Sequence, residues 1–81
     1  MTDADTLKGL IGVSLHDAQK AESLISSTLV VVERLQAQVE SFGFDAPPLM
    51  QPLLVVIDSG LAMIDQLEQV RQQLENWRNR L

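Results

Sequence analysis

The chain has 81 residues, no cysteine and a formal net charge of −5 at pH 7. Its length allows one domain at most, and the lack of cysteine excludes disulfides and thiolate metal sites. The acidic balance repels phosphate backbones and anionic lipid headgroups, which disfavours general nucleic-acid binding and membrane-surface binding.

The first predicted element is a short helix over about residues 5–11. Gly9 and Gly12 each disfavour a helix interior by roughly 1 kcal/mol relative to alanine, and Ser14 begins a capping-box sequence. These signals predict a break before residue 14. The alternative is one continuous helix from Ala4, because the heptad pattern of the next segment extends backwards to that residue.

A long helix is predicted over about residues 14–42. Its apolar and small residues are spaced alternately by three and four, which is the pattern of an amphipathic helix that packs along one stripe. The predicted stripe comprises Ile11, Ser14, Ala18, Ala21, Ile25, Thr28, Val32, Leu35, Val39 and Phe42.

Residues 43–47 are predicted to form a loop. Gly43 suits the left-handed position that follows a helix end, and Pro47 suits the first turn of a new helix. A second long helix is predicted over about residues 48–80, with a local irregularity before Pro52. Its stripe, with the same alternating spacing, comprises Leu49, Leu53, Val56, Gly60, Met63, Leu67, Val70, Leu74, Trp77 and Leu81.

The predicted fold class is therefore all-α. A single helical domain over residues 1–81 is expected, built on an antiparallel two-helix hairpin with a short N-terminal helical segment.

The apolar surface exceeds what one hairpin seam can bury. Additional apolar residues flank both stripes in the middle of the chain, and such surplus surface usually marks an interface. We therefore expect homodimerisation into a four-helix bundle. The alternative is a three-helix monomer in which the N-terminal segment covers the surplus. The predicted interface residues are Leu24, Leu29, Val31, Leu54, Ile57, Leu61 and Ile64.

Residues for catalysis or metal binding are scarce. His16 is the only histidine, and the carboxylates are scattered among glutamines rather than paired. Acid–base dyads and multi-histidine metal sites need groups that this chain lacks. The sequence predicts no enzyme activity, no cofactor and no metal site.

The C-terminal end carries the one basic cluster. Arg71, Arg78 and Arg80 surround Trp77, a combination that could contact nucleic acid or an acidic partner. Cations also favour helix C-termini for reasons internal to the fold. Nucleic-acid binding is the alternative interpretation here, because three arginines give a small electrostatic footprint.

The location expected from the sequence is cytoplasmic. No stretch reaches the roughly 18 uncharged apolar residues of a membrane-spanning helix, and the acidic start lacks the basic region of a secretory signal. The function expected is that of a protein–protein interaction module that self-associates, binds a partner helix, or does both, as an adaptor, chaperone or regulatory subunit would.

Overall fold

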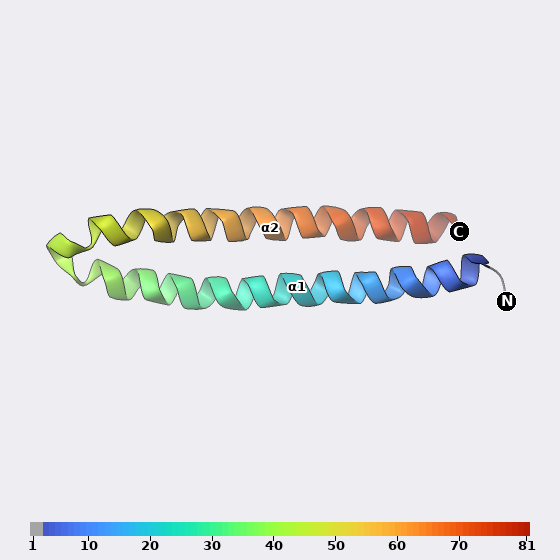
Figure 1. Ribbon diagram of the computed structural model, residues 1–81, viewed down its shortest axis with the longest axis horizontal. Helices are drawn as coiled ribbons and strands as arrows, with labels where there is room; N and C mark the ends of the chain where they lie inside the picture. The colour runs from blue at the N-terminus through green and yellow to red at the C-terminus, as the bar shows by residue number, and fades with distance from the viewer. Residues whose placement is uncertain (1–2) are drawn as a thin grey trace.

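The computed structural model describes residues 3–81, which form two long helices joined by a tight turn (Figure 1). Helix α1 spans Asp3–Glu40, a 3-10 turn η1 spans Gly43–Asp45, and helix α2 spans Pro47–Arg80. The helices run antiparallel, so both ends of the described chain lie together. The predicted all-α hairpin is confirmed, and residues 3–81 contain no strand.

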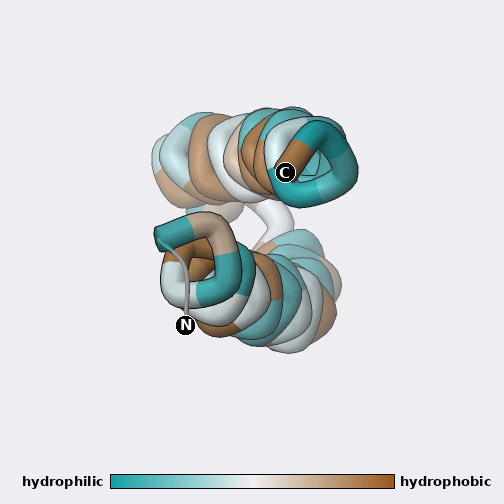
Figure 2. Tube along the Cα trace, turned by 90° about the vertical axis from the view of Figure 1, so that its right-hand side faces the viewer, coloured by the Kyte–Doolittle hydropathy of each residue, from teal (hydrophilic) through white to brown (hydrophobic). Residues whose placement is uncertain are grey.

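The molecule is a rod rather than a ball. It measures 65 × 15 × 12 Å and its radius of gyration is 18.6 Å, whereas a compact domain of this length would have about 12 Å. Viewed along the rod, α1 and α2 lie side by side (Figure 2), and residues 3–81 form no third layer. Each helix therefore has only the other to pack against.

Helix α1 is continuous, so the predicted break before residue 14 is wrong. Ile11 and Leu15, on either side of the expected break, are 2% and 9% exposed. Burying two large aliphatic side chains against α2 stabilises the helix by about 1.5–3 kcal/mol each. This gain exceeds the cost of Gly9 and Gly12, and it leaves no separate N-terminal segment to cover the hairpin.

The turn follows the chemistry expected of it. Gly43 has a φ of 68°, the left-handed conformation that glycine adopts without strain. The Ala46 amide donates to the Gly43 carbonyl at 3.1 Å, and the Met50 amide donates to the Ala46 carbonyl at 3.0 Å. Helix α2 then starts at Pro47 and continues through Pro52, so no interruption separates its first turns from the rest.

The seam between the helices has the predicted heptad spacing, but each helix is rotated. About half of the predicted stripe residues are in the seam, and the others are replaced by residues one position away. The observed seam, buried or half-buried, comprises Leu7, Ile11, Leu15, Ala18, Glu22, Ile25, Leu29, Val32, Gln36 and Val39 of α1 with Met50, Leu53, Ile57, Gly60, Ile64, Leu67, Arg71, Leu74 and Arg78 of α2.

Leu29 packs directly against the backbone of Gly60. A Cβ atom added to Gly60 would lie 2.6 Å from Cδ2 and 3.2 Å from Cγ of Leu29. Both residues are buried. The missing side chain of Gly60 is thus the space that Leu29 fills, and this match favours the observed rotation of the helices over the predicted one.

We expect Gly60→Ala and Leu29→Ala to be energetically coupled. In the wild-type background, the helix-propensity gain of about 1 kcal/mol from Gly60→Ala is offset because Leu29 must move. In the Leu29→Ala background that obstacle is absent, so Gly60→Ala should stabilise the protein by about 1 kcal/mol. Urea unfolding of the four proteins, followed by circular dichroism at one protein concentration, measures the coupling. Additive effects would contradict the contact.

Candidate interaction surface

The seam divides the rod into two long sides. Side A is the side on which Leu24 and Thr28 of α1 face Val56 and Met63 of α2 across an apolar groove. Side B is the opposite side, where a polar hollow is lined by His16 and Gln19 of α1 and by Gln72 and Glu75 of α2. Because residues seven apart share a face of a packed helix, each side can be followed along the whole rod.

Side A carries two stripes with strict seven-residue spacing, an apolar one on α2 and a mixed one on the α1 side that includes Ser14 and Thr28. These are the predicted seam residues that the observed seam leaves out. The α2 residues are each 44–53% exposed. The stripes comprise Ser14, Ala21, Thr28 and Leu35 of α1, continued by Phe42 just after this helix ends, with Leu49, Val56, Met63, Val70 and Trp77 of α2.

Three of the predicted interface residues lie in the seam instead. Leu29 is 8% exposed, and Ile57 and Ile64 are half-buried in α2 at the positions that face α1. They hold the hairpin together. A charge at Ile57 or Ile64 would therefore break the hairpin itself, whatever the oligomeric state.

The other four predicted interface residues are exposed and lie on different sides. Leu24 and Val31 are 61% and 57% exposed and lie at the outer edge of side A. Leu54 and Leu61 are 43% and 53% exposed. They lie on side B, because they share a heptad position with Glu75, which lines the hollow of side B. The α2 residues of the predicted interface are thus divided between the seam, which contains Ile57 and Ile64, and side B, which contains Leu54 and Leu61.

An ion pair interrupts the apolar seam. Nε of Arg71 lies 3.2 Å from Oε2 of Glu22, and these side chains are 30% and 15% exposed. Within the described chain this Nε is shielded from water and has no aligned hydrogen bond, so the contact is electrostatic. Sequence reasoning missed it, because Glu22 and Arg71 occupy seam positions only after the helices rotate.

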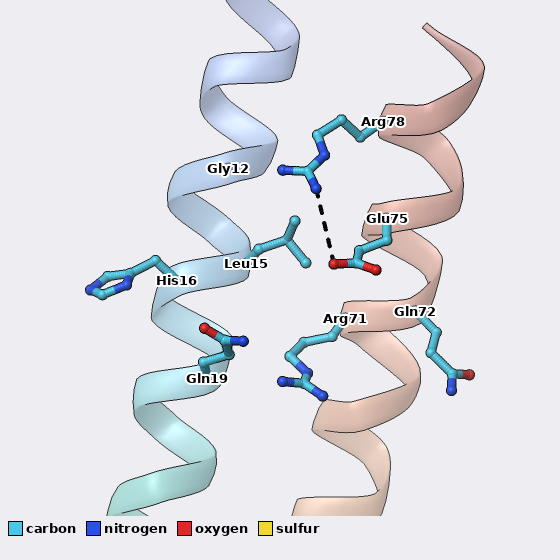
Figure 3. A pocket seen from close by; sticks show the side chains of 8 residues that line it. All are labelled: Gly12, Leu15, His16, Gln19, Arg71, Gln72, Glu75 and Arg78. Carbon is cyan, nitrogen blue, oxygen red and sulfur yellow. Dashed lines mark ion pairs between the residues drawn. The ribbon is translucent and has the colours of Figure 1, made fainter.

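The remaining arginines have contacts of their own. Nη2 of Arg78 lies 4.0 Å from Oε1 of Glu75, with both side chains largely exposed (Figure 3). Nε of Arg80 donates to the Asn76 carbonyl at 3.3 Å. Arg78 lines side B, whereas Arg80 lines a hollow of side A beside Trp77. The structure therefore does not bring these residues together into one basic patch.

The polar hollow of side B contains the only histidine. The His16 side chain is directed away from the space between the helices, whereas Arg71, Glu75 and Arg78 are directed into it (Figure 3). Within residues 3–81, no group of three or more histidine, cysteine, aspartate or glutamate side chains is placed to hold a metal ion.

Helix α2 is more apolar than predicted. One 18-residue window has a mean hydropathy of 1.4 with at most two charged residues, and 6% of that window is buried. By length and composition alone, α2 could cross a membrane. The same window carries Val56 and Met63 of side A together with the seam residues Ile57 and Ile64, so the exposed stripe contributes only part of its apolar character.

Comparison with protein families, curated proteins and solved structures finds no match to this chain.

We expect Arg71→Gln to be more destabilising than Arg78→Gln. The first change leaves the shielded Glu22 carboxylate without its cation, which should lower the free energy of unfolding by about 1–3 kcal/mol. The second removes an exposed pair and should cost only a few tenths of a kcal/mol. Urea unfolding of both variants tests the difference. Equal, small effects would show that the Glu22–Arg71 pair contributes nothing to the seam.

Proposed function

We propose that this chain is a non-enzymatic protein-interaction module that self-associates through side A into a four-helix bundle. The proposal places it in the cytoplasm as an adaptor, chaperone or regulatory subunit. The observation that carries the proposal is the exposed apolar stripe of α2, which lies along the same side of the rod as the exposed Leu35 and Phe42.

The exposed area supports a second protein layer. The hairpin exposes 6013 Å², whereas a folded monomer of its mass, 9.0 kDa, exposes about 4,900 Å². The excess of about 1,100 Å² is more than the roughly 800 Å² that each partner buries in a standard interface. Docking of one further hairpin through an interface of standard size would therefore remove most of the excess.

Side A suits this role better than side B. Its two central stripes contain no charged residue, whereas the corresponding positions of side B include Glu33, Glu68 and Glu75. A charge buried in an interface without a partner is strongly unfavourable. The apolar pair Leu54 and Leu61 on side B is too short to bury a comparable area.

Two other functions have weaker support. A nucleic-acid regulator would use the C-terminal arginines, but these are divided between the two sides of the rod. A membrane-inserted hairpin would use the apolar part of α2, but Asp58 would then have to enter hydrocarbon at considerable cost. Both functions become outcomes of the experiment below.

We expect Met63→Glu to dissociate the oligomer and Leu61→Glu to leave it intact. The two residues are two positions apart and are each 53% exposed in the hairpin, but Met63 lies on side A and Leu61 on side B. Light scattering coupled to size-exclusion chromatography measures the mass, and circular dichroism checks that the variants stay helical.

A dimer that only Met63→Glu dissociates supports the proposal. Dissociation by Leu61→Glu alone would indicate that the interface lies on side B instead. A wild-type monomer at all concentrations would contradict self-association. In that case, vesicle flotation and salt-dependent RNA binding of the monomer would test the two weaker functions.

A further inference from the structure

We propose that the second copy docks on side A in the reverse direction, with its turn over the free ends of the first. The twofold axis of this dimer lies in the interface and crosses the rod at the level of Thr28 and Met63. This inference rests on the proposed function and specifies its geometry.

The positions of the stripes point to this axis. Thr28 is the middle member of the five-residue stripe in α1, and Met63 is the middle member of the stripe in α2. The two residues line the same groove. A twofold axis that crosses the rod at this level therefore places each stripe over the reversed stripe of the second copy. Both stripes are matched over their whole length.

Reversal matches residue sizes in α1. Ser14 then meets Phe42 of the second copy, and Ala21 meets Leu35 of the second copy, so each small residue faces a large one. Thr28 faces its own copy at the axis. Alternation of small and large side chains across facing positions fills the space between helices without voids.

The α2 stripe has apolar partners throughout. Leu49 faces Trp77 of the second copy, Val56 faces Val70, and Met63 faces its own copy. Each of these side chains is about half exposed in the single hairpin. Their burial is the main gain from association.

The edges of side A favour the reversed direction over the parallel one. In the reversed dimer, Leu24 faces Val31 of the second copy, and Ser59 faces Gln66 of the second copy. Apolar residues thus meet apolar ones, and polar residues meet polar ones. In a parallel dimer α1 would pack on α2 of the second copy, which sets Leu24 against Gln66 and Val31 against Ser59.

Charge complementarity favours the same direction. Reversal brings Arg80, at the free end, over Asp45 in the turn of the second copy. A parallel dimer would not form this pair, because its α2 packs on α1 of the second copy and Arg80 then lies at the opposite end from the turn. Like charges in proximity destabilise an interface, whereas opposite charges set its register.

Spin labels at the turn test the direction. Phe44 is fully exposed at the tip, and the chain has no native cysteine, so Phe44→Cys gives one label for each copy without disturbing the seam. In the reversed dimer the labels should be separated by nearly the length of the rod, 65 Å. In a parallel dimer they would lie within roughly 20 Å of each other, since packed helices are only about 8–10 Å apart.

A second variant locates the axis. Thr28→Cys should form an intermolecular disulfide under mild oxidation, because only residues close to a twofold axis meet their own copies. Ser26→Cys, on side B, should remain reduced. Short label distances, or a Thr28→Cys variant that stays reduced in a proven dimer, would overturn the reversed geometry alone. A labelled protein with the mass of a monomer would instead overturn the proposed function.

Discussion

Two helices in contact can bury only one stripe each, and this geometric limit determines most of the features of the hairpin. Each helix has two adjacent apolar stripes and a single neighbour to cover them. One stripe from each helix forms the seam, and the other is left along side A. The exposed stripe is therefore a direct result of a fold without a third layer, rather than a local defect in packing.

The choice between the two stripes depends on a few contacts. Leu29 enters the space above Gly60, and a bulkier residue at position 60 would separate the helices there. Glu22 and Arg71 can pair across the seam only in the same rotation. A charged pair in a seam contributes modest stability, but it disfavours other alignments in which either charge would be buried alone. The main contribution of the Glu22–Arg71 pair is therefore to favour one alignment of the two helices.

The sequence predicted the helices, the turn and the direction of the hairpin correctly, because heptad spacing, Gly43 and Pro47 are local signals. It did not predict which stripe forms the seam. Both candidates have the same spacing, and contacts across the hairpin distinguish them, namely the fit of Leu29 to Gly60 and the pairing of Glu22 with Arg71. The same ambiguity placed Ile57 and Ile64 in an interface between copies. The predicted break failed for a related reason, since glycine propensity is local and the burial of Ile11 depends on α2.

The glycines near the start of α1 have a consequence for local stability. A Cβ atom at Gly9 or Gly12 would meet no other atom within 4 Å, so neither glycine is required for close packing. Each lowers the cost of unwinding its turn by roughly 1 kcal/mol relative to alanine. The amide protons of these first turns will therefore exchange with solvent through local fraying, while those around Leu29 exchange only when the whole hairpin opens.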